Sequence, residues 1–314
     1  MTAKVFIDGD VGTTGLQIRQ RLDGRGDLEL LRLAEAERKD PERRRAMLNA
    51  ADAAILCLPD AAAIDAVGMI DNPDVKVIDA STAHRVAEGW TYGFPEYDAG
   101  QHAAIRAAKR VANPGCYALT SVAILHPLIA GGLLPADHPV TINAVSGYSG
   151  GGKQMIAAFE ETGGADAGTP FFAYGLGLKH KHVPEITRWS GLAHAPLFVP
   201  SVGHYAQGMI VQVPLQLWAL PGAPKAAEIH AALADHYAAS RFVSVPALAE
   251  TAEMARLEPE GVNGTNELRV HVFANADAGQ AVVMGLIDNL GKGASGQAVQ
   301  NLNIMLGADE GEGL

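Results

Sequence analysis

The first third of the chain alternates short apolar runs with amphipathic stretches, and this alternation is the strongest constraint on the fold. The apolar runs have the length of buried strands, and the stretches between them are patterned as helices. Strands joined by helices in this way form a parallel sheet with right-handed crossovers and helices on both faces. The expected strands cover residues 4–8, 28–33, 53–58 and 75–79, and the expected helices cover residues 15–22, 41–50 and 61–69.

The part of the chain after residue 116 has longer apolar runs. Consecutive runs of this kind suit neighbouring strands of a mixed or antiparallel sheet, so we expect an α+β second domain. The last residues are polar and are expected to be frayed. The expected strands cover residues 140–146, 209–218, 268–274 and 281–288, the expected helices cover residues 118–129 and 298–306, and the tail is residues 307–314.

Composition narrows the class of protein. A chain of 314 residues exceeds the usual size of one domain, so two domains are expected. The net charge of -11 argues against non-specific binding of nucleic acid. The first residues lack the apolar core of a signal peptide, and no apolar run approaches the ~18 residues of a membrane span. The two cysteines, Cys57 and Cys116, provide no disulfide framework, so we expect a cytoplasmic protein without a membrane partner.

A glycine-rich turn follows the first expected strand and leads into the first helix. Its Gly-x-x-Gly-x-x-Gly spacing is a variant of the common dinucleotide-binding pattern. Glycines let the backbone approach a pyrophosphate, which the N–H groups of the helix start stabilise. The alternative is a turn whose glycines serve only helix–strand packing. The predicted cofactor-binding residues of this turn are Gly9, Gly12, Thr13, Thr14 and Gly15.

The end of the second expected strand indicates which dinucleotide binds. NAD sites usually offer an Asp or Glu there for the ribose hydroxyls, whereas this chain has Arg32 and Leu33. Arg38 and Lys39 follow closely, and a guanidinium suits a 2′-phosphate. We therefore predict NADP as the cofactor, with Arg38 among its contacts. A solvated helix start is the alternative interpretation of Arg38 and Lys39.

Cys116 stands directly before an apolar, helix-patterned run, after a Pro-Gly pair that indicates a tight turn. Unpaired N–H groups and the positive end of the helix dipole favour a thiolate at such a position, which makes the thiol a candidate nucleophile. The alternative is a small buried residue packed at a helix start. Cys57 lies within an apolar run and is interpreted as part of the core.

A reactive thiol needs a proton carrier, for which histidine is the usual residue. His204 lies in the glycine-flanked segment 203–208, directly before an expected strand, and is the leading candidate. His180, His182 and His271 remain open as candidates, and so does a structural role for His204.

Two segments are candidate anion sites. Residues 146–153 form a glycine-rich loop that ends with Lys153 and suits a phosphate, or else a mobile linker. Residues 179–182 concentrate cations, which indicates an anionic substrate or a solvated surface. No metal site is predicted, because only His180 and His182 are closely spaced and no Cys lies near them in sequence.

These segments together resemble the N-acetyl-γ-glutamyl-phosphate reductase family, in its shorter subtype. The resemblance covers essentially the whole chain. The related aspartate-semialdehyde dehydrogenases share the architecture but carry Asn directly before the cysteine, where this chain has Gly115. The segments that carry the resemblance are residues 9–15, 79–85, 92–96, 113–117, 146–153, 179–185, 203–208 and 288–294.

The resemblance implies roles for individual residues. Cys116 matches the family's nucleophile and His204 its acid–base histidine. Ser81 matches a position on the nicotinamide side of the cleft. A loop that returns to the cofactor implies further cofactor contacts at Asn289, Lys292 and Gly293, and the implied substrate contacts are Arg85, Lys153, Lys179 and His182.

The resemblance also implies a fold and an assembly. The expected fold class is α/β, with a Rossmann-type NADP-binding domain from residues 1–116 and 289–314. Residues 117–288 are expected to form an α+β catalytic and dimerisation domain with a mixed sheet. The implied assembly is a homodimer or a homotetramer.

The implied activity is the NADPH-dependent reduction of N-acetyl-glutamyl 5-phosphate, a small-molecule acyl phosphate, in arginine biosynthesis. The products are N-acetyl-glutamate 5-semialdehyde and phosphate, formed through a thioester on Cys116. One alternative is a related acyl-phosphate reductase of the aspartate-semialdehyde or aminoadipate type. The others are a thiol acyl-transferase or hydrolase without hydride chemistry, and a dinucleotide-binding regulator.

Overall fold

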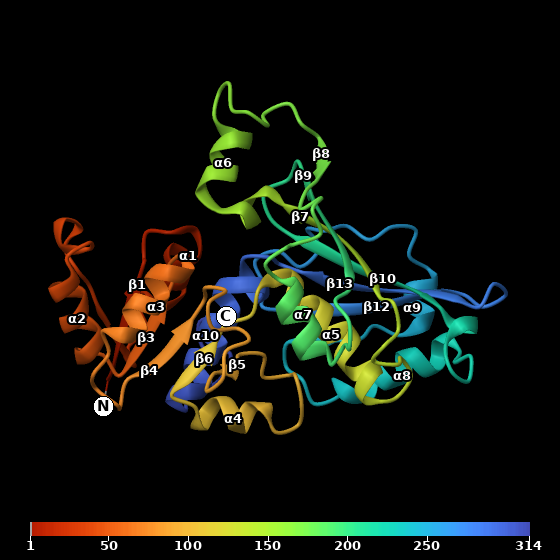
Figure 1. Cartoon of the computed structure of the whole chain (residues 1–314), viewed down its shortest axis with the longest axis horizontal. Coiled ribbons are helices and arrows are strands. Elements are labelled where there is room, and N and C mark those ends of the chain that lie inside the picture. Colours follow the sequence, from red (N-terminus) through yellow and green to blue (C-terminus); the bar gives the residue numbers. More distant parts are fainter. Residues whose placement is uncertain (1) are drawn as a thin grey trace. The chain divides into compact units, whose positions relative to one another are not determined.

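The structure is a computed structural model that describes residues 2–314, and the chain divides into two compact units (Figure 1). Unit 1 contains the chain up to Gly115 together with Ala294–Leu314. Unit 2 contains Cys116–Gly293. Unit 1 is thus built from both ends of the sequence, and unit 2 from the middle.

Unit 1 contains the predicted parallel sheet. Its six strands run in the order β2-β1-β3-β4-β6-β5, and every neighbouring pair is parallel. Asp40 caps helix α2 by accepting hydrogen bonds from the N–H groups of Glu42 (2.9 Å) and Arg43 (3.3 Å). Strands β5 and β6 and helix α4 were not predicted, because their apolar runs are very short. The elements are β1 (Ala3–Asp8), α1 (Thr13–Leu22), β2 (Leu28–Leu31), α2 (Pro41–Ala50), β3 (Ala53–Leu56), α3 (Asp60–Gly68), β4 (Lys76–Asp79), β5 (Thr91–Tyr92), α4 (Gln101–Ala107), β6 (Arg110–Ala112) and α10 (Gly296–Leu306).

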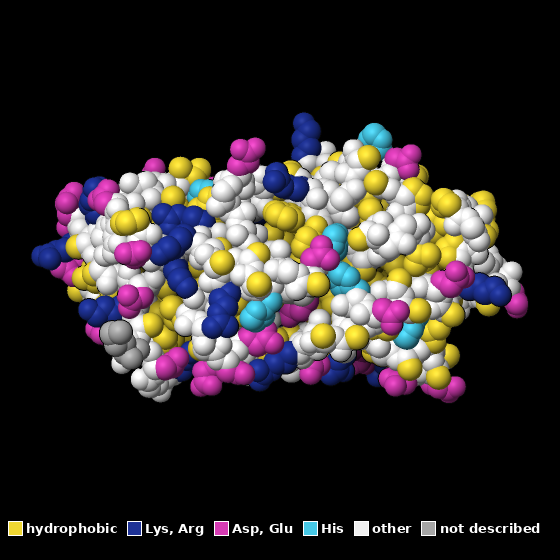
Figure 2. Space-filling view, turned by 90° about the horizontal axis from the view of Figure 1, so that it is seen from below, with side chains coloured by type: hydrophobic (Ala, Val, Ile, Leu, Met, Phe, Trp, Pro, Cys, Tyr) yellow, Lys and Arg dark blue, Asp and Glu magenta, His cyan; other side chains and the backbone are white. Residues whose placement is uncertain are grey.

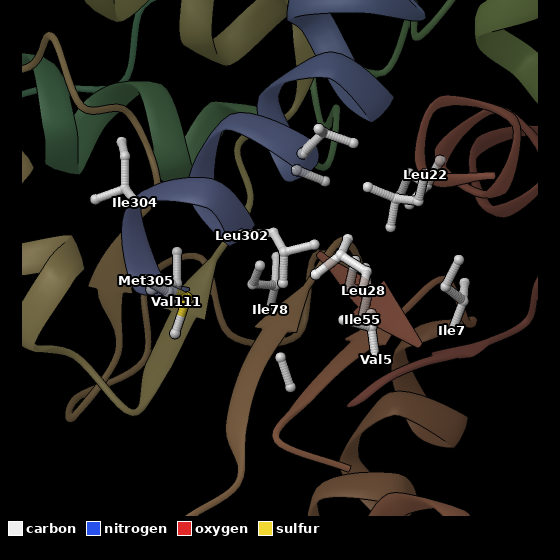
Figure 3. Packing of buried hydrophobic residues seen from close by; sticks show 14 of the residues in the cluster. Val5, Ile7, Leu22, Leu28, Ile55, Ile78, Val111, Leu302, Ile304 and Met305 are labelled. Atoms are coloured by element: carbon white, nitrogen blue, oxygen red, sulfur yellow. The ribbon is translucent and has the colours of Figure 1, made fainter. Parts of the chain in front are cut away.

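Both faces of this sheet are buried. Val5, Ile55 and Ile78 point to one face, where they pack with Leu302 of α10 and with residues of α1 and α4 (Figure 3). Neighbours of these strand residues in sequence point to the other face and pack with α2 and α3. Because side chains alternate along a strand, burial on both faces requires continuous apolar runs, and this is why the strands were visible in the sequence.

The C-terminal tail is held in place, so the predicted fraying is wrong. Asn303 Nδ2 donates hydrogen bonds to the carbonyl oxygens of Glu310 (3.1 Å) and Glu312 (2.9 Å). Arg25 Nη1 donates to the same carbonyl of Glu312 (3.1 Å), and Leu314 packs against the core of unit 1. Polar composition gave no sign of these contacts, because they satisfy the backbone of the tail and not its side chains.

Unit 2 contains the predicted mixed sheet. Its seven strands run in the order β11-β12-β13-β10-β7-β9-β8, with the pairs β7–β9 and β11–β12 parallel and the other pairs antiparallel. Helix α5 packs on the sheet, with α7 and α8 beside it (Figure 1). The elements are α5 (Cys116–Ala130), β7 (Thr141–Gly147), α6 (Gly152–Glu160), β8 (Phe171–Ala173), α7 (Val183–Ser190), β9 (Leu197–Gly203), β10 (Met209–Gln216), α8 (Ala226–His236), β11 (Val243–Ser244), α9 (Leu248–Ala252), β12 (Leu268–Asn275) and β13 (Gln280–Ile287).

Surface charges are paired locally. On the face that Figure 2 presents, groups of Lys and Arg side chains are bordered by Asp and Glu. Typical ion pairs join Arg256 to Glu258 (2.8 Å) and Lys109 to Asp74 (3.2 Å). No helix in residues 2–314 is both long and apolar enough to cross a bilayer.

Candidate active site

The glycine-rich turn after β1 has two positions that only glycine can occupy. Gly9 has a φ of 94°, and a Cβ there would lie 2.4 Å from the carbonyl oxygen of Cys57. A Cβ on Gly15 would lie 2.3 Å from the carbonyl oxygen of Gly9. Gly12 differs, since a Cβ there would make only an ordinary contact at 3.4 Å. Packing therefore explains Gly9 and Gly15, whereas Gly12 leaves open space at the start of α1.

The start of α1 presents its backbone N–H groups without a competing acceptor. Within the described chain, no side chain caps this helix and no acidic residue stands in its first turn. These N–H groups and the positive end of the helix dipole suit a pyrophosphate. Asp10 is the one carboxylate in the turn before the helix, and it is engaged by Arg19 (3.3 Å) and Arg38 (3.6 Å).

A cavity of about 730 Å³ adjoins this turn, a volume typical of sites for small molecules and cofactors. Its cations include Arg44, which is committed to the buried carboxylate of Asp8 at 2.8 Å. Arg38 is less constrained, with a third of its side chain exposed. The donor set and the cavity therefore fit a nucleotide cofactor. The lining includes Phe6 to Val11, Leu30 to Leu33, Arg38, Lys39, Leu58 and Ala62.

Replacing Arg38 tests the cofactor prediction. We expect Arg38→Ala to weaken NADPH binding by about tenfold or more and to leave NADH binding nearly unchanged, because only NADPH carries the 2′-phosphate. Binding is measured by fluorescence titration of each nucleotide. Arg43→Ala is the matched control, because Arg43 lies on neighbouring α2 with most of its side chain exposed. Equal weakening of both nucleotides would contradict the assignment.

The turn that precedes Cys116 is tied down within unit 1. Asn113 Nδ2 donates to the carbonyl of Ala294 (3.1 Å), and Asn113 Oδ1 accepts from Asn301 Nδ2 (3.0 Å). Buried Arg85 donates to the carbonyls of Asn113 and Ala80, both at 3.0 Å. Two of its donors thus brace the backbone, while its predicted substrate contact stays a prediction.

Ser81 follows β4 and is buried against that strand's last residue. Its Oγ donates to Asp79 Oδ2 (2.7 Å) and accepts from the N–H of Ala83 (3.1 Å). His84 Nδ1 lies 2.6 Å from the same carboxylate oxygen of Asp79. Ser81 therefore shapes the turn after β4, and its predicted cofactor contact is untested by this geometry.

Cys116 is the first residue of α5, two residues earlier than the predicted helix. Gly293 packs directly on it, because a Cβ on that glycine would lie 2.8 Å from the Cβ of Cys116. The next residue, Tyr117, is buried and donates its hydroxyl to the carbonyl of Ser201 (3.1 Å). Close packing on both sides therefore fixes the first turn of α5.

Two histidines and a tyrosine surround Tyr117. The rings of His180 and His182 lie 5.9 and 6.0 Å from the Tyr117 ring, and 4.8 Å from each other. Tyr174 lies 5.7 Å from His180, and its hydroxyl is 3.5 Å from that of Tyr117. Burial raises the pKa of Tyr174 to about 12, and the nearby Cys116 adds to the rise. Tyr174 is therefore protonated at neutral pH and can donate a hydrogen bond.

His204 lies in different surroundings. It directly follows β9, its side chain is exposed, and its Nδ1 is 3.1 Å from the carbonyl oxygen of Thr169. Its ring meets Phe159 edge-on at 5.2 Å and Tyr148 at 6.3 Å. These contacts place His204 on an aromatic cluster beside α6, whereas His180 and His182 are the histidines packed on Tyr117.

The remaining predicted residues fall into exposed and buried groups. Lys153 on α6 and Lys179 before α7 are exposed. Lys292 is fully buried, with its Nζ 5.5 Å from the centre of the Phe242 ring. Asn289 is also buried, and its carboxamide is hydrogen-bonded to Ser149 and to Gly208, both in unit 2.

Sequence reasoning did not single out Tyr174 or Glu185. Glu185 is 2% exposed and stands three residues after His182, which is the N-cap of α7. Residues with this spacing share one face of a helix, so the His-x-x-Glu pattern was a usable signal. Tyr174 carried no local signal, because its approach to Tyr117 depends on the pairing of β8 with β9.

The two cysteines are expected to differ in reactivity. Burial raises the pKa of Cys57 to about 12, and the charge of Asp79 adds to the rise, so about 10⁻⁴ of this thiol is ionised at pH 8. The helix start at Cys116 favours the thiolate. Iodoacetamide at pH 8 should therefore label one site per chain, located by peptide mass spectrometry at Cys116. Cys116→Ala should lose this label, and comparable labelling of Cys57 would contradict the account.

The fold is that of the semialdehyde dehydrogenases. The chain is similar to aspartate semialdehyde dehydrogenase II from Vibrio cholerae, solved in complex with ASA, with a TM-score of 0.69, 15% identity and 98% coverage of each chain. It is also similar to aspartate semialdehyde dehydrogenase with NADP from Candida albicans, with a TM-score of 0.66, 14% identity and coverage of 97% of this chain and 98% of that one.

Sequence comparison identifies the family within this class. Residues 116–289 match the family model described as semialdehyde dehydrogenase, dimerisation domain. Over 304 residues the chain is 56% identical to N-acetyl-gamma-glutamyl-phosphate reductase of Burkholderia cenocepacia, covering 97% of each protein. The chain belongs to the N-acetyl-γ-glutamyl-phosphate reductase family and contains the dimerisation domain of semialdehyde dehydrogenases.

Proposed function

We propose that the protein reduces N-acetyl-glutamyl 5-phosphate to N-acetyl-glutamate 5-semialdehyde and phosphate, with NADPH as the reductant, in arginine biosynthesis. The observation that carries this proposal is the position of Cys116 as the first residue of buried helix α5, in a chain of this family. A thiol there can form a thioester, which is the chemistry that an acyl phosphate requires.

We assign cofactor binding to unit 1. The predicted domain of residues 1–116 with 289–314 also included Cys116 and residues 289–293, which lie in unit 2. The glycine turn, the uncapped start of α1 and the neighbouring cavity fit a dinucleotide. Arg38 and the absence of an acid directly after β2 favour NADP, the nucleotide in the Candida albicans structure. Gly9 and Gly15 shape the turn, while Gly12, Thr13 and Thr14 present the backbone to the pyrophosphate.

Catalysis is assigned to unit 2 and begins at Cys116. Its thiolate attacks the acyl carbonyl, the sulfur–carbon bond forms, and the carbon–oxygen bond to phosphate breaks. The N–H groups in the first turn of α5 have no partner within the helix and can stabilise the oxyanion. The product of this step is an acyl thioester on Cys116, with inorganic phosphate as the leaving group.

The reduced nicotinamide, when bound, supplies the hydride that the thioester accepts. The resulting thiohemiacetal on Cys116 collapses to the aldehyde, and the sulfur leaves as thiolate. A nearby acid–base group holds the proton of the hydroxyl as the charge on oxygen changes. The predicted carrier is His204. The geometry of unit 2 favours His182, which is buried, packs on Tyr117 and has Glu185 on the same helix face.

Removal of the thiol tests the reaction directly. We expect Cys116→Ala to lower the rate at least about 10³-fold, because no other group forms the thioester. The reverse reaction is assayed with N-acetyl-glutamate semialdehyde, phosphate and NADP⁺, following NADPH formation. Aspartate semialdehyde is the comparison substrate, and faster turnover of it would favour the related reductase. Equal rates in wild type and variant would contradict the mechanism, and absence of NADPH formation would favour a non-redox acyl-transferase.

Histidine variants locate the proton carrier. We expect His182→Asn to lower kcat about 10²-fold or more and to remove one limb of the pH–rate profile, whereas His204→Asn retains that limb. Steady-state rates are measured from pH 5 to 9, a range of about four units that spans the usual histidine pKa. His194→Asn is the control, because His194 is exposed in the same unit. The opposite pattern would assign the role to His204.

We also propose that the protein is a homodimer or homotetramer that assembles through unit 2. Gly285 faces α5, since a Cβ there would lie 2.2 Å from Thr120 Cγ2, so neighbouring Met284 points to the opposite face of the sheet. On that face Val145, Val282 and Met284 are only half-buried. The match to a dimerisation domain supports this assembly. The proposed location is the cytoplasm, in keeping with two free cysteines.

A further inference from the structure

Two loops of unit 2 are joined along their backbones. The serine loop comprises residues 146–151, and the histidine loop comprises residues 203–208. The N–H of Gly147 donates to the carbonyl of Gly208 (2.9 Å), and the N–H of Ser149 donates to that of Ala206 (3.0 Å). A Cβ on Gly147 would lie 2.6 Å from the backbone of Ala206. Displacement of either loop therefore displaces the other.

Asn289 lies beneath both loops and bonds each of them. Its Nδ2 donates to Ser149 Oγ (3.1 Å), and its Oδ1 accepts from the N–H of Gly208 (2.7 Å). The residue is 2% exposed, so these bonds form away from competing water. Gly208 has a φ of 108° and no room for a Cβ, which fixes the direction of its N–H. One carboxamide therefore sets the spacing of the two loops.

The neighbouring Asp288 holds the backbone beside Asn289 in place. This carboxylate is fully buried and accepts four hydrogen bonds. Two come from the N–H groups of Leu290 and Gly291, and one comes from the Nε2 of Gln207 in the histidine loop (2.6 Å). The end of β13 is therefore locked to the histidine loop at two adjacent residues.

We propose that Asn289 is a positioning residue, which holds the histidine loop against the serine loop and anchors both loops to residues 288–293, the segment whose Gly293 packs on Cys116. The catalytic effect expected of Asn289 rests on the function proposed above. Both ends of the carboxamide are engaged within unit 2, so the residue acts through the loops, in place of the cofactor contact predicted from the sequence. Its loss misplaces groups of the site by distances to which catalysis is sensitive.

The experiment compares Asn289→Ala, Asn289→Asp and Ser149→Ala with Asn275→Ala. Asn275 is the matched control, because it is an Asn at the opposite end of the same hairpin whose side chain accepts one hydrogen bond. An Asp at 289 still accepts from Gly208, and the Ser149 hydroxyl can turn to donate to it, so this variant keeps both links. Each variant is measured for kcat, for the KM of NADPH, and for hydrogen exchange in residues 146–151 and 203–208.

For Asn289→Ala we expect kcat to fall about 10²-fold with the KM of NADPH within about twofold of wild type. Exchange should accelerate in both loops and not elsewhere. Asn289→Asp should recover most of kcat, Ser149→Ala should show an intermediate effect, and Asn275→Ala should match wild type. If Asn289→Ala does not fold, Asn289→Asp, Ser149→Ala and Asn275→Ala are compared with wild type by the same measurements.

A rise in the KM of NADPH with kcat retained would overturn the proposal and make Asn289 a cofactor contact. Unchanged exchange in both loops would also overturn it. Failure of the proposed function has a separate signature, since wild type would then not turn over the acyl phosphate. The exchange measurement would still decide whether Asn289 orders the loops.

Discussion

The contact between Gly293 and Cys116 is the constraint on which the catalytic unit depends. No side chain fits at residue 293, and a second glycine, Gly285, lets Thr120 approach β13 closely. Together these contacts fix the distance between α5 and the sheet and the position of the first residue of α5. Because the helix is buried along most of its length, it cannot shift without breaking its packing. The position of the thiol is therefore set by contacts with two glycines, which have no side chain that could rotate away.

The same use of glycine shapes the cofactor cavity of unit 1, with one informative difference. Gly9 and Gly15 are required by contacts of the protein with itself, whereas Gly12 is not. Packing within unit 1 thus does not require a glycine at residue 12. A glycine there lets a phosphate approach the backbone closely. The pairing of Asp8 with Arg44 at 2.8 Å removes one carboxylate charge from that cavity.

Sequence patterns predicted the helices and strands that are determined by residues within the segment itself. Helix α2 has the predicted bounds because Asp40 and Pro41 define its start. Strand β9 was missed because Pro200 interrupts its apolar pattern, and β5 because it has two residues. Such short or broken segments are strands only because of the neighbours with which they pair.

The site residues divide in the same way. The positions of Cys116 and of the glycine turn follow from local sequence, although α5 begins at Cys116, two residues before the predicted helix start. The partners of Asn289 lie 140 and 81 residues away in sequence, so no local pattern could reveal them. The grouping of His180 with Tyr117 likewise joins residues that are far apart in sequence. Roles that depend on contacts between residues distant in sequence could be identified only from the structure.

The central claim is that an acyl group passes through Cys116, and the most direct measurement is to trap it. The protein is mixed with N-acetyl-glutamyl 5-phosphate without NADPH, quenched in acid and analysed by intact and peptide mass spectrometry. The account predicts one N-acetyl-glutamyl adduct per chain, on the peptide that contains Cys116, lost on addition of NADPH and absent in Cys116→Ser. An adduct on another residue, or an unmodified Cys116 in a protein that turns over, would contradict it.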